Sequence, residues 1–174
     1  MKHKLLVLTA TVMALSSCSQ NTRTSNNINV KDDSVTKKAT EQVSPKTLFA
    51  TLRIKSSIKA GDSVKLKFTV YNPTDSVKQF CKWHTPFEPL MSKYLEIKNE
   101  EGEEMAYQGP MAKRVMPPPL DSYIKINAKD SIQASVDIIK AYAITQPGKY
   151  TITYVGQNMS NVVVNESVSF VYEK

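Results

Sequence analysis

The stretch Val64-Lys65-Leu66-Lys67-Phe68-Thr69-Val70 alternates apolar and polar side chains at every step. A period of two puts the apolar residues on one face of a β-strand and the polar residues on the other, which is typical of a strand that covers a core. The same alternation precedes it in residues 48–54 and returns in residues 150–154. Turn-forming residues at 59–62 separate the first two runs. The pattern predicts an all-β fold.

Short runs of this kind recur along the chain, and turn signals separate them about every eight to twelve residues, a spacing typical of β-sandwiches. We therefore predict an all-β, antiparallel, immunoglobulin-like sandwich that forms one domain over residues 48–174. We also expect one helical turn at residues 137–142, capped by Asp137. The expected strands are residues 48–55, 64–70, 77–83, 94–98, 105–107, 123–126, 132–138, 150–154, 162–164 and 168–172.

The N-terminus has the order of an export signal: basic Lys2 and Lys4, an apolar run, and then small residues before Cys18. The stretch Leu15-Ser16-Ser17-Cys18 resembles the lipobox of bacterial lipoproteins, in which the cysteine receives the lipid. We therefore expect a lipoprotein signal peptide at residues 1–17 and a membrane anchor through lipidated Cys18. The alternative is an ordinary secretory signal in which the cysteine is accidental.

Residues 18–47 are rich in Ser, Thr, Asn and Lys and contain almost no large apolar residues, so we predict a flexible tether. The expected location is the cell envelope, as an outer membrane lipoprotein. No acidic run follows Cys18, which favours the periplasmic side over the cell surface. Asp33-Ser34-Val35 resembles an O-glycosylation sequon of bacterial envelope proteins, which makes Ser34 the glycosylation candidate, although Asp-Ser pairs are also ordinary turn residues.

The formal net charge of +7 raises the question of nucleic-acid binding. The basic residues are scattered singly, and no Lys/Arg cluster alternates with aromatic residues. The export signal also argues against an intracellular partner. We therefore expect no nucleic-acid partner.

Catalytic residues are scarce in this sequence. Outside the signal peptide, His84 is the only histidine, so an HExxH zinc site is excluded, and no Gly-x-Ser-x-Gly motif accompanies it. Cys81 and His84 could pair as nucleophile and base only if the strand bends, because residues three apart on a strand point to opposite faces. One cysteine and one histidine also fall short of a structural zinc site. We expect no enzyme, no metal and no cofactor.

The resemblance to a known family is carried by residues 83–88, 94–97, 107–110, 113–114, 123–124, 141–142, 147–152 and Tyr154. Together these segments resemble the propeptide-like N-terminal β-sandwich of bacterial peptidyl-lysine metalloendopeptidases of the deuterolysin type. In those proteases the module precedes a zinc domain with an HExxH motif, which this sequence lacks, so no catalytic residue is carried over. The resemblance implies a binding role toward a protease domain, in latency or in assisted folding.

These observations predict a non-catalytic envelope lipoprotein that binds a protein partner, with a zinc metallopeptidase as the implied one. The expected surface combines residues 83–90 with the proline-rich residues 107–119, where Trp83 is an apolar anchor or, alternatively, a core residue. A further hypothesis has His84 and Cys81 ligating a protease zinc in trans. The alternative function is a structural or adhesive immunoglobulin-like module without a protease partner. The partner-binding candidates are Trp83, His84, Thr85, Pro86, Glu88, Lys113 and Arg114.

Overall fold

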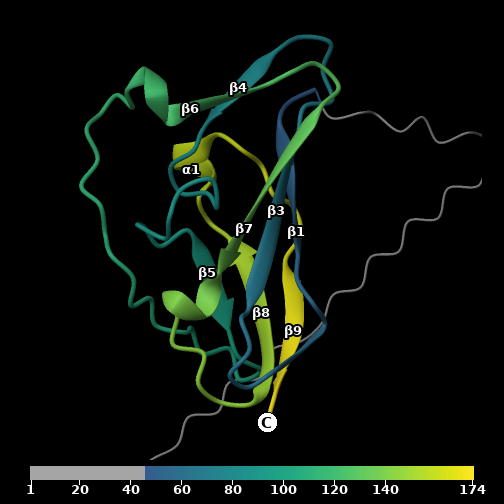
Figure 1. Cartoon of the computed structure of the whole chain (residues 1–174), viewed down its shortest axis with the longest axis vertical. Coiled ribbons are helices and arrows are strands. Elements are labelled where there is room, and N and C mark those ends of the chain that lie inside the picture. Colours follow the sequence, from purple (N-terminus) through teal and green to yellow (C-terminus); the bar gives the residue numbers. More distant parts are fainter. Residues whose placement is uncertain (1–45) are drawn as a thin grey trace, which may run out of the picture. The chain divides into compact units, whose positions relative to one another are not determined.

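The structure is a computed structural model, and it describes residues 46–174. Strands dominate this part of the chain, with two 3-10 turns and one short helix between them (Figure 1). The elements are β1 (Phe49–Arg53), β2 (Ser57–Lys59), β3 (Lys65–Tyr71), β4 (Lys78–Cys81), β5 (Leu95–Lys98), η1 (Leu120–Ser122), β6 (Tyr123–Ile126), β7 (Ser131–Asp137), η2 (Ile138–Lys140), β8 (Gly148–Tyr154), α1 (Gln157–Ser160) and β9 (Val168–Glu173).

The strands form two main sheets, one in the order β1-β3-β7 and the other in the order β2-β9-β8-β5. β1 pairs antiparallel with β3, whereas β2 crosses to the other sheet and pairs in parallel with β9. The remaining main-sheet pairs are antiparallel. This division of strands matches the two-sheet arrangement of immunoglobulin-like sandwiches. The prediction of an all-β sandwich is confirmed.

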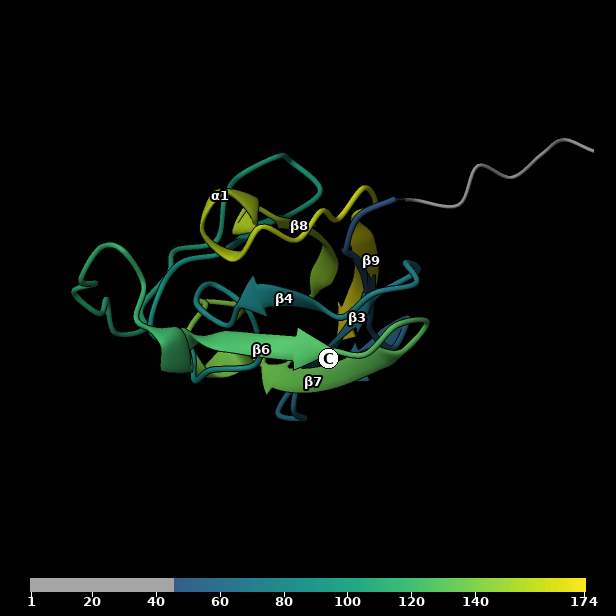
Figure 2. The same ribbon diagram turned by 90° about the horizontal axis from the view of Figure 1, so that it is seen from above.

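The core lies between these two sheets. Leu66, Phe68 and Val70 of β3 are completely buried, as their alternation with lysine and threonine predicts. Ile152 and Tyr154 of β8 face them from the other sheet, and the rings of Phe68 and Tyr154 are 5.2 Å apart. Burying such a side chain contributes about 1.5–3 kcal/mol, so this layer carries much of the stability. Seen from above, β8 and β7 belong to different layers (Figure 2).

β4 and β6 form a separate two-stranded sheet, and they lie side by side in Figure 2. Buried Asn72, at the end of β3, ties this pair to the main sheet. Its side-chain amide donates to the carbonyls of Ser76 (2.8 Å) and Ile126 (3.1 Å). Ser76 precedes β4, and Ile126 is the last residue of β6. The Asn72 side chain therefore fixes the position of the end of the small sheet at which β4 begins and β6 ends.

Three local predictions were wrong. Residues 105–107 form no return strand: the pairing with β5 stops after the Glu104–Lys98 bridge and the bond from the Met105 N–H to the Ile97 carbonyl (2.7 Å), and Tyr107 bridges to Tyr142 instead. Residues 162–164 likewise provide one bridge, from Val163 to Phe49. The helical turn predicted at residues 137–142 is present as η2, but its predicted cap is wrong, because the Asp137 side chain makes no cap hydrogen bond there. The prediction also missed β2 and α1.

The predicted signal peptide, the tether up to residue 45, lipidated Cys18 and the glycosylation candidate Ser34 lie outside the described residues. Within residues 46–174, none of the helices is both long enough and apolar enough to span a bilayer.

Candidate functional site

β4 ends at Cys81, and the chain then makes a compact turn over residues 82–90, which we call the corner. Fully buried Thr85 closes it. The Thr85 hydroxyl donates to the carbonyl of Lys82 (2.6 Å) and accepts the N–H of Phe87 (3.2 Å). These bonds replace the strand pairing that ends at Cys81, so the corner is an ordered turn.

The corner is fixed to the sandwich through His84, whose backbone has a positive φ of 60°. That conformation costs a non-glycine residue about 1–2 kcal/mol. The Tyr154 hydroxyl of β8 donates to the His84 carbonyl (2.9 Å) and is also hydrogen-bonded to Ser160 of α1 (2.7 Å). At Gly156, a Cβ atom would lie 2.5 Å from the same carbonyl. A glycine is therefore required where α1 meets the corner.

Arg114 closes over the corner from a distant part of the chain. Its Nη2 lies 2.6 Å from Glu88 Oε1, and the two side chains are only 16% and 7% exposed. Its guanidinium carbon lies 4.7 Å from the centre of the Trp83 ring, a cation–π arrangement that covers the indole. Glu88 Oε1 also accepts the backbone N–H of His84 (3.0 Å). One ion pair thus joins both ends of the corner to Arg114.

Arg114 belongs to the proline-rich residues 108–119, which we call the strap. The strap contains no strand or helix and runs along the margin of the domain in Figures 1 and 2. Just before the strap, the Tyr107 hydroxyl donates to the Leu90 carbonyl (3.0 Å), and within the strap the Ala112 N–H donates to the carbonyl of Met91, the residue after the corner (2.8 Å). These bonds and the Arg114 ion pair attach the first half of the strap to the corner.

The strap and the first residue of η1 carry large apolar side chains that face solvent. Met111 is 70% exposed, Val115 77%, Met116 63% and Leu120 91%. Ala112 and Arg114 are partly buried, whereas Met111, Lys113 and Val115 are exposed. Every second side chain in the first half of the strap therefore faces solvent. An exposed apolar group of this kind marks an interaction surface more often than an isolated exposed leucine does.

The structure revises the roles of the partner-binding candidates. Trp83 is 7% exposed beneath Arg114, so it is a buried residue and not an exposed anchor. Arg114 is committed to Glu88, which leaves Lys113 as the exposed member of that basic pair. Thr85 and Pro86 are buried and His84 is half-buried. The predicted residues lie beneath the strap and form what we call the base of the surface. The sequence did not reveal the exposed apolar residues of the strap above this base.

An open groove lies beside the corner, with a volume of about 530 Å³. Three prolines line one side, Pro86 and Pro89 from the corner and Pro110 from the strap. The end of β7, residues 135–137, also lines it, as do Lys140 and Ala141 and the other corner residues Phe87, Glu88 and Leu90. The groove and the exposed strap residues therefore meet at Pro110.

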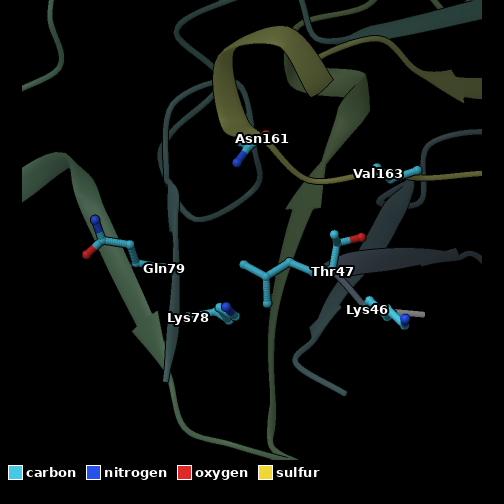
Figure 3. Close-up of a pocket in the computed structure, with 7 residues that line it drawn as sticks. Lys46, Thr47, Lys78, Gln79, Asn161 and Val163 are labelled. Atoms are coloured by element: carbon cyan, nitrogen blue, oxygen red, sulfur yellow. The ribbon is translucent and has the colours of Figure 1, made fainter. Parts of the chain in front are cut away.

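A second hollow, of about 300 Å³, lies between the start of β1, β4 and the segment after α1 (Figure 3). Its charged lining residues, Lys46 and Lys78, are both exposed, and neither forms an ion pair within residues 46–174. It shares no lining residue with the groove. We assign it no role in the candidate surface.

Cys81 and His84 do not form a reactive pair. Cys81 is 2% exposed, and burial raises the pKa of its thiol. Burial lowers the pKa of His84, and the neighbouring Arg114 charge lowers it further. A protonated, buried thiol is a poor nucleophile and a poor metal ligand. The hypothesis that both residues ligate a protease zinc in trans is therefore wrong, because Cys81 cannot reach a partner.

Native Cys81 is expected to react with a thiol reagent more than about tenfold slower than in denaturant, because both its burial and its raised pKa suppress the thiolate. Peptide mapping by mass spectrometry after timed labelling of the full-length protein measures this rate at Cys81. Equal rates in buffer and in denaturant would show that the β4 end opens readily, contrary to the packing of the corner.

The acidic residues of the β5 turn do not assemble a metal site. Glu100, Glu101, Glu103 and Glu104 are exposed at this turn, and Glu104 forms an ion pair with Lys93. Within residues 46–174, no group of three or more His, Cys, Asp or Glu side chains is placed to hold a metal ion. The acidic turn is consistent with a solvated hairpin tip, which discourages edge pairing.

Three further Asp-Ser pairs that are followed by an aliphatic residue lie in the described part of the chain, and in each the serine is exposed near the start of a strand. Ser131 illustrates their structural role, because its N–H donates to Asp130 Oδ1 (2.7 Å) at the start of β7. Such turns need no modification to explain them. The other two serines are Ser63 and Ser76.

No protein-family model matches the chain, and no curated protein is significantly similar to it. The resemblance to the protease propeptide module therefore stays a hypothesis that rests on the motifs quoted above.

Proposed function

We propose that this chain is a non-catalytic binding protein that docks another protein against the strap. The observation that carries the proposal is the exposure of Met111, Val115, Met116 and Leu120 on one segment with a fixed base. Apolar surface gains about 25 cal/mol per Å² when it is removed from water, so a partner that covers these side chains has a substantial driving force. Large exposed apolar patches commonly mark protein interfaces.

The base supports the proposal because it reduces the entropy cost of binding. Arg114 is held by Glu88 and by the Trp83 ring, and the triple proline at 117–119 restricts the second half of the strap. A segment that is already ordered loses less conformational freedom on docking, and the saving appears as affinity. Charge contributes little, since Lys113 is the exposed basic residue of the strap.

The partner that we propose is an envelope protein, and the propeptide resemblance names a zinc metallopeptidase as the first candidate. Binding would keep the peptidase latent or assist its folding. The location that we propose is the outer membrane, on the periplasmic side, because we expect a lipid anchor at Cys18.

A structural or adhesive role is the second candidate function, and the immunoglobulin-like division of the strands favours it. Modules of this architecture serve many cell-surface functions, so the fold alone does not choose between the two. The identity of the protein that contacts the strap does choose, because an adhesive module has no reason to contact a peptidase.

The test is photo-crosslinking of the full-length protein in the cells that produce it. A photoreactive residue at Leu120 is expected to yield an adduct containing a zinc metallopeptidase, identified by mass spectrometry. The same photoreactive residue at Val77, which is 56% exposed immediately before β4, is the control and is expected to yield no adduct. An adduct with a structural envelope protein would favour the adhesive role. Indistinguishable products at both positions would refute docking against the strap.

Replacing Met116 and Leu120 together by aspartate is expected to weaken retention of the crosslinked partner by about tenfold or more, because central apolar contacts each contribute roughly 1 kcal/mol or more. Val77→Asp, the matched exposed control, is expected to leave retention unchanged. Thermal unfolding of all variants checks the fold. Equal loss in the control would contradict a localised docking surface.

A further inference from the structure

β7 is an unprotected sheet edge. It is the last strand of the order β1-β3-β7, so among residues 46–174 it pairs with β3 on one side only. The sequence Ser131-Ile-Gln-Ala-Ser-Val136 contains no charge and no proline. Exposed edges are usually protected by charged residues, prolines or bulges because their unpaired backbone groups accept another strand. β7 is therefore a template for strand addition along an uncharged run of six residues.

The groove runs beside the second half of this edge. Residues 135–137 of β7 line it together with the corner, and its volume of about 530 Å³ falls in the range of ligand clefts, about 300–1,000 Å³. The opposite wall contains Pro86, Pro89 and Pro110, which have no backbone N–H. That wall offers apolar contact, and its Phe87 and Glu88 N–H groups are already bonded to Thr85. The backbone of β7 is the natural hydrogen-bonding partner for a segment in the groove.

The charged side chains of the groove indicate where a charge on the ligand can pair. The Glu88 carboxylate is paired with Arg114 (2.6 Å), and Asp137 Oδ1 accepts the backbone N–H of Val64 (3.0 Å). Lys140 is exposed and forms no ion pair with any residue in the described range 46–174. Asp137 keeps its negative charge, and Lys140 is the cationic lining residue that can pair with a carboxylate on the ligand.

We infer that the groove takes an extended peptide segment that adds to β7 as a further strand and places a carboxylate beside Lys140. Backbone hydrogen bonds to β7 supply affinity, and the proline wall and Lys140 supply selectivity, as in other cases of strand addition. The inference deepens the proposed function, and it rests on that function in one respect: the segment belongs to the protein that docks on the strap.

The experiment selects binders to the full-length protein from a random octapeptide phage library. Enriched peptides are expected to alternate apolar residues and to carry a carboxylate. The best peptide is then synthesised with and without N-methylation at alternate residues, which removes backbone donors and keeps the side chains. N-methylation is expected to weaken binding by about tenfold or more, since several hydrogen bonds are lost. Backbone amide shifts in NMR spectra should move at residues 131–137.

Lys140→Gln is expected to weaken binding of the carboxylate peptide about fivefold, whereas Lys125→Gln, at the exposed position of β6, should leave it unchanged. The inference is overturned if no peptide is enriched above protein-free beads, if N-methylated peptides bind equally well, or if the two lysine variants behave alike. Met116→Asp with Leu120→Asp separates the two proposals, because these residues do not line the groove. If Leu120 crosslinks to a partner but no peptide is enriched, the groove inference is wrong and the proposed docking against the strap is unaffected.

Discussion

Arg114→Ala is expected to lower the free energy of unfolding by about 3 kcal/mol, because removing one member of a buried ion pair leaves the other charge without compensation. Glu88 is 7% exposed and would keep only the backbone N–H of His84 as a partner. The variant would also uncover Trp83 and release the middle of the strap. Denaturant unfolding of the full-length protein measures the loss, and crosslinking at Leu120 should disappear with it.

Two controls separate the ion pair from general damage. Lys113→Ala, at the exposed neighbour of Arg114, is expected to change stability by no more than about 0.5 kcal/mol. Adding Glu88→Gln to Arg114→Ala should recover part of the loss, because the uncompensated charge is then gone. If Arg114→Ala and Lys113→Ala cost the same, Arg114 does not fix the strap, and the pre-organised base in our proposal is wrong.

The strands could be predicted because the period of two is a local property. Val64, Leu66, Phe68 and Val70 are all completely buried, as their alternation with polar residues requires. The crossing of β2 to pair in parallel with β9 could not be predicted, because nothing in three residues specifies a partner more than a hundred positions away. Tyr107 failed as a strand residue for the same reason, since its bridge to Tyr142 depends on a distant segment.

The candidate surface could be located from the sequence but its composition could not. Unusual residues collect in the corner, and the proline run predicts an ordered loop nearby. The sequence did not reveal which of these side chains are exposed. Trp83, for example, is covered by Arg114, which lies thirty-one positions later in the chain. Met116 and Leu120 carry no periodic pattern that would assign them to a core, and that absence was the available signal that they face outward.

Raising the pH above about 10 is expected to destabilise the protein steeply, because three tyrosines are buried as neutral phenols. Tyr94 is completely buried, Tyr142 is 2% exposed and Tyr154 is 7% exposed, and burial raises the pKa of each hydroxyl far above its ordinary value. In the unfolded chain these groups lose their protons near pH 10, whereas the folded protein retains them. The folded state then binds more protons, so stability falls as the pH rises.

Each such group contributes a slope of about 1.4 kcal/mol per pH unit above pH 10, so the three together give about 4 kcal/mol per unit. Below the unfolded pKa their contribution is fully present and independent of pH. Denaturant unfolding followed by circular dichroism at several alkaline pH values measures the slope. Tyr142→Phe removes one ionisable group and should reduce the slope by about a third, although it also removes the hydroxyl that bonds both backbone groups of Leu95. If tyrosinate absorbance from all eight tyrosines developed near pH 10 in protein that stayed folded, the hydroxyls would be accessible to water and the packing around Tyr154, which fixes the corner, would be wrong.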